Sequence, residues 1–137
     1  MKKYFMYKIL FTAFAVIIML VVSSCKKNNN SSGPAEEQLT ISTDALALNE
    51  IPGPGTDFNL TILSAMPPAG VQIAVVVKGE IDNVVYYTGP FIETTSKTTN
   101  VGINSLPKQK ICICTITVTS KSKSTNFATA IFRVVYK

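Results

Sequence analysis

The stretch that decides the fold is Lys110–Lys121, KICICTITVTSK, in which apolar and polar side chains alternate. Cys112, Cys114, Ile116 and Val118 fall on one face, and the threonines between them fall on the other. Successive side chains of a β-strand point to opposite faces of a sheet, so alternation over this length indicates a strand with one buried face. We therefore expect a half-buried strand here.

Six further segments of the chain have a similar strand-like pattern, and they are separated by turns rich in Pro, Gly and polar residues. These segments are residues 39–48, 58–62, 71–77, 84–88, 101–103 and 128–134. No window shows a helical period of comparable strength. Residues 38–137 are therefore predicted to form one all-β domain, and seven strands in about 100 residues indicate a two-sheet sandwich.

The end of the chain, Ile103–Lys137, contains a Leu-Pro turn, a long strand, a polar loop and a closing strand. In this order it resembles the end of a fibronectin type III or related immunoglobulin-like domain. The resemblance implies a seven-stranded immunoglobulin-like β-sandwich. The chain departs from that pattern at Ile111 and Cys112, where such domains often carry a tyrosine. It also has no tryptophan, so we expect Phe58 to replace the usual core tryptophan.

The beginning of the chain has the pattern of a signal peptide. Three lysines and no acid lie in residues 1–8, and the apolar run Ile9–Val22 follows with Thr12 as its only polar member. This run is short for a bilayer span, which needs about 20 apolar residues. A permanent membrane helix is the alternative, but Lys8 and Ser23 limit its length.

Val22, Ser23, Ser24 and Cys25 resemble the lipobox of bacterial lipoproteins, in which a branched residue and two small residues precede an invariant cysteine. Valine here takes the position where leucine is commonest. The resemblance implies that residues 1–24 are cleaved as a lipoprotein signal peptide, that the Cys25 thiol carries a diacylglycerol, and that its new amino group is acylated. Acyl chains contribute about 0.8 kcal/mol per buried methylene and would anchor the protein to a membrane.

Residues 25–37 are predicted to be the lipidated cysteine and a flexible linker. The linker contains Lys, Asn, Ser, Gly and Pro but no large apolar residue. Such a segment has a root-mean-square span of about 20 Å. In lipoproteins sent to the outer surface of some Gram-negative cells, acids follow the cysteine directly, whereas the first acids here are Glu36 and Glu37. The resemblance therefore favours an outer-membrane anchor with the domain on the periplasmic face.

Composition argues against several function classes. Without the three signal lysines, ten Lys and Arg oppose eight Asp and Glu, which gives a net charge of +2. This small excess, with no basic stretch interleaved with aromatics, argues against a nucleic-acid partner. The absence of histidine excludes histidine-dependent nucleophiles and histidine metal sites. We expect a non-enzymatic protein without a cofactor, bound to the membrane through its acyl chains and to an unidentified envelope protein or glycan.

Cys112 and Cys114 raise the question of redox or metal chemistry. On one face of a strand their Cβ atoms would lie about 6.6 Å apart, beyond the 3.5–4.5 Å that a disulfide needs. We expect two small core residues, with pairing through a bulge or a labile metal site as alternatives.

Acid-based hydrolysis would need two carboxylates facing one cleft. The candidates all fall at predicted strand ends or turns: Asp44, Glu50, Asp57, Glu80, Asp82 and Glu93. Glu80 and Asp82 could together hold a calcium ion, with solvated turn charge as the alternative.

Two surfaces are candidates for binding. Tyr86, Tyr87 and Phe91 could bind a glycan, because adjacent residues in a strand face opposite ways and one tyrosine of the pair should be accessible. The alternative is that the accessible aromatic simply covers its neighbours. The sequence thus predicts a binding, adhesion or scaffolding module, with a glycan-binding accessory module as the alternative.

The predicted topology places the loops 64–70, 89–100 and 120–126 at the end where the chain enters the domain. Their lysines could contact anionic headgroups, with solvated loop charge as the alternative; they are Lys97, Lys121 and Lys123. The opposite loops would then be the more accessible recognition surface; they are residues 49–57, 78–82 and 105–110.

Overall fold

The computed structural model describes residues 35–137, so the predicted signal peptide, Cys25 and linker residues 26–34 lie outside the described residues. The described part contains nine strands and no helix. The strands are β1 (Ile41–Thr43), β2 (Leu48–Ile51), β3 (Thr56–Ile62), β4 (Val71–Gly79), β5 (Val85–Thr88), β6 (Ile92–Thr94), β7 (Thr98–Ile103), β8 (Ile111–Ser120) and β9 (Phe127–Tyr136). Accordingly, nothing in residues 35–137 forms a helix long and apolar enough to cross a membrane.

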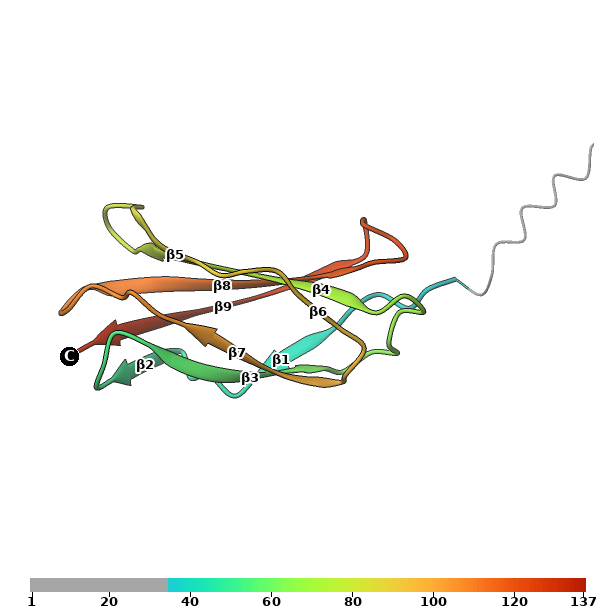
Figure 1. Cartoon of the computed structure of the whole chain (residues 1–137), viewed down its shortest axis with the longest axis horizontal. Coiled ribbons are helices and arrows are strands. Elements are labelled where there is room, and N and C mark those ends of the chain that lie inside the picture. Colours follow the sequence, from blue (N-terminus) through green and yellow to red (C-terminus); the bar gives the residue numbers. More distant parts are fainter. Residues whose placement is uncertain (1–34) are drawn as a thin grey trace, which may run out of the picture. The chain divides into compact units, whose positions relative to one another are not determined.

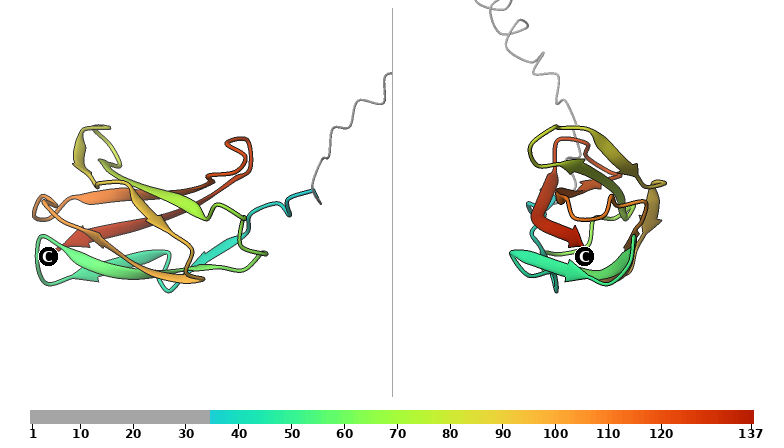
Figure 2. Two further views of the ribbon diagram at one scale, coloured as in Figure 1. Left: turned by 45° about the vertical axis from the view of Figure 1, so that its right-hand side comes forward. Right: turned by 90° about the vertical axis from the view of Figure 1, so that its left-hand side faces the viewer.

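The strands form two sheets, which confirms the prediction of an all-β, two-sheet sandwich. The smaller sheet has the order β1-β3-β7, and the larger has the order β2-β9-β8-β4-β5, with β6 paired to the other end of β4. Figure 1 shows the long strands β4, β8 and β9 in one layer and β3 and β7 in the other, and the end-on view in Figure 2 looks along both layers.

The strand predicted from Lys110–Lys121 is β8, at the centre of the larger sheet. It pairs antiparallel with β4 on one side and with β9 on the other. Its buried and half-buried residues alternate along the strand as predicted. Cys112 and Cys114 are both free and buried, so the prediction that they are small core residues is confirmed.

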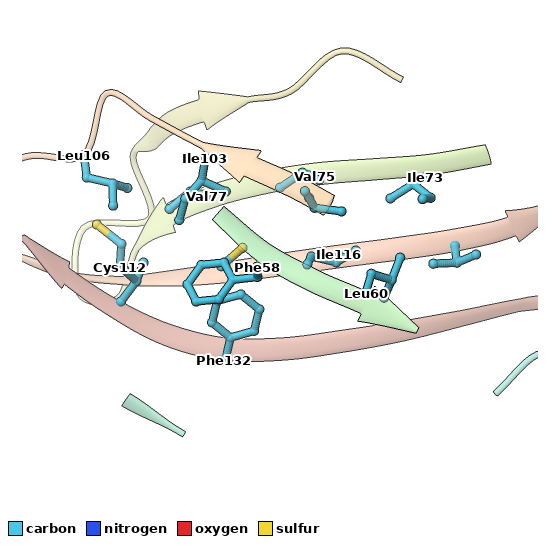
Figure 3. Packing of buried hydrophobic residues seen from close by; sticks show 14 of the residues in the cluster. Phe58, Leu60, Ile73, Val75, Val77, Ile103, Leu106, Cys112, Ile116 and Phe132 are labelled. Carbon is cyan, nitrogen blue, oxygen red and sulfur yellow. The ribbon is translucent and has the colours of Figure 1, made fainter. Parts of the chain in front are cut away.

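The core lies between the two sheets and consists of β-branched and aliphatic side chains with two aromatic rings (Figure 3). Phe58 from β3 and Phe132 from β9 pack edge to face, with ring centroids 4.6 Å apart and an interplanar angle of 63°. Such a pair contributes about 0.5–1.5 kcal/mol beyond the area that it buries. The chain has no tryptophan, and Phe58 is therefore one of the two aromatic residues at the centre of the core.

The structure has two more strands than the seven predicted. The predicted first strand, 39–48, divides because Asp44 turns away from β1 and accepts hydrogen bonds from the backbone N–H and the side-chain amide of Asn59. The chain then joins the other sheet, where β2 pairs parallel with β9. The second addition is β6, which pairs with β4 in a segment predicted to be a polar loop.

Asn126 ties the start of the domain to the loop between β8 and β9. Its side-chain oxygen accepts a hydrogen bond from the Leu39 N–H at 2.7 Å, and its amide nitrogen donates to the Glu37 carbonyl at 2.8 Å. The side chain is only 2% exposed. Glu37, which the sequence placed in the flexible linker, is therefore hydrogen-bonded to the sandwich.

Replacing Asn126 should destabilise the domain, because Asn126→Ala leaves a buried N–H and a carbonyl without their partners. Each unsatisfied group costs about 1–3 kcal/mol, so we expect a loss of about 3 kcal/mol in the free energy of unfolding, measured by urea denaturation. Asn100→Ala, at an exposed position on β7, is the matched control and should leave the midpoint unchanged. Equal midpoints for the two variants would contradict this role of Asn126.

Candidate binding surfaces

The adjacent tyrosines lie at a bulge in the pairing of β4 with β5. Val77 is opposite Tyr87 and Lys78 is opposite Val85, so Tyr86 is the extra residue between them. A bulge changes the alternation of side chains and re-aims them. Both tyrosines are half-buried and pack against the core. The prediction of one core tyrosine and one accessible tyrosine is therefore wrong, because strict alternation fails at this position.

The hydroxyl group of Tyr86 belongs to a polar cluster. It donates a hydrogen bond to Asp82 Oδ2 at 2.8 Å, while Lys110 Nζ donates to the same carboxylate oxygen at 3.0 Å and to the tyrosine oxygen at 2.8 Å. The ammonium group also lies 5.4 Å from the centre of the Tyr86 ring. This cluster borders a groove of about 390 Å³ formed by residues 79–82 and 109–111.

The cluster shifts the protonation equilibria of its members. Hydrogen bonds from Lys110, Tyr86 and the Val84 N–H hold the pKa of Asp82 at about 2, below the ordinary 3.8. The hydrogen bonds with Tyr86 and Asp82 in turn raise the pKa of Lys110. Both groups are therefore charged across the physiological pH range, so the cluster acts as a fixed ion pair and not as a proton donor or acceptor.

Most of the candidate carboxylates have partners in the described structure. Glu80 pairs with Arg133, Asp82 with Lys110, Glu93 with Lys121 and Glu50 with Lys137. The two residues considered for calcium binding thus each face a cation. Residues 35–137 contain no group of three or more Cys, His, Asp and Glu side chains placed to hold a metal ion.

Asp57 differs from these residues, because it has no ion pair and no side-chain hydrogen bond within residues 35–137. Asp44 is engaged by Asn59. The six candidate carboxylates therefore do not converge on one cleft, and Asp57 is the one available to a ligand.

Tyr87 lies in a second groove, of about 480 Å³, between the β7 side of the smaller sheet and the segment that connects β5 to β6. The lining residues are Gly55, Thr56, Asp57, Val75, Tyr87, Gly89, Pro90, Ile92, Gly102, Ile103 and Asn104. Phe91 is not among them and is 69% exposed. Tyr86, Tyr87 and Phe91 therefore do not form one aromatic platform.

The three lysines considered for headgroup contact lie in loops that do share one end of the domain. The backbone N–H of Lys121 donates to the Gly70 carbonyl at 3.0 Å, and the Ala69 N–H donates to Ser122 Oγ at 3.1 Å. However, Lys97 donates to the Ser64 carbonyl and Lys121 pairs with Glu93. Among these three, only the Lys123 ammonium lacks a protein partner in the described structure.

The outer face of the larger sheet carries apolar side chains that the sequence analysis did not select as a site. We call this surface the outer face and define it by four of its exposed large apolar residues: Leu48, Ile111, Phe127 and Ile131. Ile131 is 68% exposed and lies opposite Thr115, which in turn lies opposite Val76. The ion pairs of Arg133 with Glu80 and of Lys137 with Glu50 supply charge near the apolar residues. The outer face could have been predicted from the alternation along β9, because this alternation places Phe127 and Ile131 on the side opposite the buried Phe132.

Comparison of the chain with protein-family models, with curated proteins and with solved structures finds no match. The surfaces described above are therefore the basis on which a function is assigned.

The polar cluster gives a prediction about pH. Because the pKa of Asp82 is lower in the folded protein than in the unfolded chain, its contribution to stability is present above pH 3.8 and is lost as the pH falls towards 2. An NMR titration of the Asp82 carboxyl carbon should have its midpoint near 2 in the native protein and a higher midpoint in Lys110→Met. Glu50→Gln is the control. An unchanged Asp82 midpoint in Lys110→Met would show that the cluster does not form.

Proposed function

We propose that the protein is a lipid-anchored, non-enzymatic binding module of the bacterial cell envelope. Cys25 is its acylated first residue, and an immunoglobulin-like sandwich is its recognition domain. The observation that carries the binding function is the exposed apolar surface of the outer face.

The strand order supports the immunoglobulin-like part of the proposal. In that fold the A, B and E strands share one sheet and the C, F and G strands share the other. Strands β1, β3 and β7 correspond to the first set, and β4, β8 and β9 correspond to the second. The first strand is divided between the sheets, so that β2 pairs parallel with β9.

The lipobox-like sequence at Val22–Cys25 supports the anchor. Dual or triple acylation gives stable membrane attachment, whereas a single chain gives only marginal binding. The absence of acids directly after Cys25 favours the periplasmic face of the outer membrane over the cell surface. The membrane is then one partner, through the acyl chains, and an envelope protein is the other.

The chemistry of the outer face favours a protein partner. Exposed large apolar side chains on one face of a folded domain can mark an interaction site. The large apolar residues of the outer face stand among threonines on the neighbouring strands. A sugar ligand would instead need aromatic rings with free faces. Phe127 supplies one ring, at 54% exposure, and the other three residues that define the outer face are aliphatic.

The non-enzymatic part of the proposal is supported by the chemistry available. The chain has no histidine, both described thiols are buried, and burial raises the pKa of Cys114 to about 12. A thiol with so high a pKa is protonated and unreactive at neutral pH. Neither cysteine therefore serves as a nucleophile.

Glycan binding in the groove beside Tyr87 is the alternative function. Asp57, Asn104 and Thr56 line that groove and could accept or donate hydrogen bonds to sugar hydroxyl groups. One tyrosine is a small stacking surface, however, because Tyr86 is held in the polar cluster and Phe91 lies outside the groove.

The anchor predicts the mass of the native protein. Material extracted from membranes should begin at Cys25 and carry acyl chains, and Cys25→Ser should lose these chains and remain uncleaved. Intact-mass spectrometry measures both, and protease added to whole cells should leave a periplasmic domain undigested. An unmodified chain beginning at Met1 in the native protein would overturn the lipoprotein assignment.

The outer face predicts where the protein partner binds. A photo-crosslinking amino acid at position 131 should give one discrete, protease-sensitive adduct in intact cells, because Ile131 lies within the proposed contact. Phe127→Lys in the same chain should reduce the adduct at least tenfold, since a charged residue would enter the apolar contact. Mass spectrometry of the adduct identifies the partner.

The control for this experiment is Leu63, which is 61% exposed but lies outside the outer face. A crosslinker at position 63 should give no adduct, and Leu63→Lys should not change the adduct from position 131. Equal adducts from the two positions would contradict the proposal. Binding on a glycan array that is lost in Tyr87→Ala, with no protein adduct, would establish the alternative instead.

A further inference from the structure

Strand β7 is an edge strand without the features that usually block edge-to-edge pairing. It pairs only with β3, so its other side has no strand beside it in the described structure. The other edge strands of residues 35–137 are short: β1 and β6 have three residues, and β2 and β5 have four. By contrast, β7 has six residues and contains no charge, no proline and no register shift. Short strands, charges, prolines and bulges are the usual protection of an edge.

The register shows which backbone groups β7 presents at this edge. The Ile62 N–H donates to the Lys97 carbonyl at 2.8 Å, so Lys97 and every second residue after it point their backbone groups towards β3. Thr98, Asn100 and Gly102 therefore point their N–H and C=O groups away from β3. None of these groups has another hydrogen bond within residues 35–137.

The groove that contains Tyr87 runs beside the Gly102 end of this edge. Three glycines, Gly55, Gly89 and Gly102, line it without side chains, and a Cβ atom at Gly89 would lie only 3.1 Å from the Tyr87 hydroxyl oxygen. Val75 and Ile92, from the facing sheet, supply apolar lining. An added strand would therefore point every second side chain between the sheets, towards Val75 and Ile92.

The carboxylate of Asp57 supplies the charge of this site. Asp57 lies opposite Gly102 in the register, and a Cβ atom at position 102 would lie 2.8 Å from Asp57 Oδ1. Because Gly102 has no side chain, the Asp57 carboxylate lies over β7 at Gly102, next to the free edge of β7. It has no cationic partner in the described structure. In an added strand, side chains alternate between the groove and the opposite face of the sheet. Those on the opposite face would lie next to the Asp57 carboxylate.

We propose that β7 binds an extended segment of a partner protein as an added strand. The segment donates and accepts hydrogen bonds at Thr98, Asn100 and Gly102, places an apolar side chain in the groove beside Tyr87, and places a lysine or arginine against Asp57. A second copy of β7 does not fit this description, because the strand contains no basic residue. This site is separate from the outer face, so the two binding proposals succeed or fail independently.

The test uses the full chain extracted from membranes in detergent and a phage-displayed library of random seven-residue peptides. Selected peptides should alternate apolar and polar residues and contain a lysine or arginine. Asn100→Pro should weaken their binding at least tenfold, because it removes one N–H at the free edge and none that pairs with β3. Asp57→Asn should weaken binding of the basic peptides about tenfold, and Glu50→Gln, on β2, should not change it.

Amide hydrogen exchange with and without the selected peptide gives a second measurement that does not depend on a variant's folding. Protection should increase at Asn100 and Gly102 and stay constant on β9. Failure to select any peptide, or equal binding by the native chain and a folded Asn100→Pro variant, would overturn the proposal. So would a β7-dependent dimer in sedimentation, or an oligosaccharide that binds the groove and is unaffected by Asn100→Pro. An adduct at position 131 that persists in Asn100→Pro would leave the outer-face function intact in each case.

Discussion

The pairing of β8 with both of its neighbours is the constraint on which the rest of the structure depends. β8 is paired along nearly its full length with β4 on one side and with β9 on the other. The inward set of Cys112, Cys114, Ile116 and Val118 is almost completely buried, so a register slip of one residue would move all four to the outer face. The sandwich, its core and the position of its free edges all follow from this register.

That register could be predicted from the sequence because the information is local. The alternation in β8 is unbroken, and it identified the strand, its buried face and the state of both cysteines. The same pattern identified most of β3, β4 and β9. It failed for β2 and β6, because these short strands are defined by the strands they pair with: β2 pairs with β9, and β6 pairs with the first three residues of β4.

The candidate sites were predicted less well, because they depend on contacts between distant residues. The bulge at Tyr86 cancels the alternation that the sequence analysis applied to the tyrosine pair. The ion pair of Glu80 with Arg133 joins the residue after β4 to a residue of β9, and the local sequence of neither segment predicts it. The free carboxylate of Asp57 could be recognised only once the register with Gly102 was known. The alternation along β9, by contrast, was visible in the sequence. It was used to predict the buried residues of β9 but not the exposed apolar residues on its other face.

The hydrogen bonds of Asn126 have a mechanical consequence. Any pull on the chain from its N-terminal side reaches the sandwich first at Glu37 and Leu39, which Asn126 holds, and then at the three-residue strand β1. The Asn126 carbonyl also accepts a hydrogen bond from the Ser120 N–H of β8, and Asn126 directly precedes β9, so these first contacts already load the larger sheet. The next attachment along the chain is the pairing of β2 with β9. We expect tension to release residues 37–43 first, with Leu39 leaving the core, while β2 still pairs with β9. This release would lengthen the N-terminal side of the domain before the remaining strands separate.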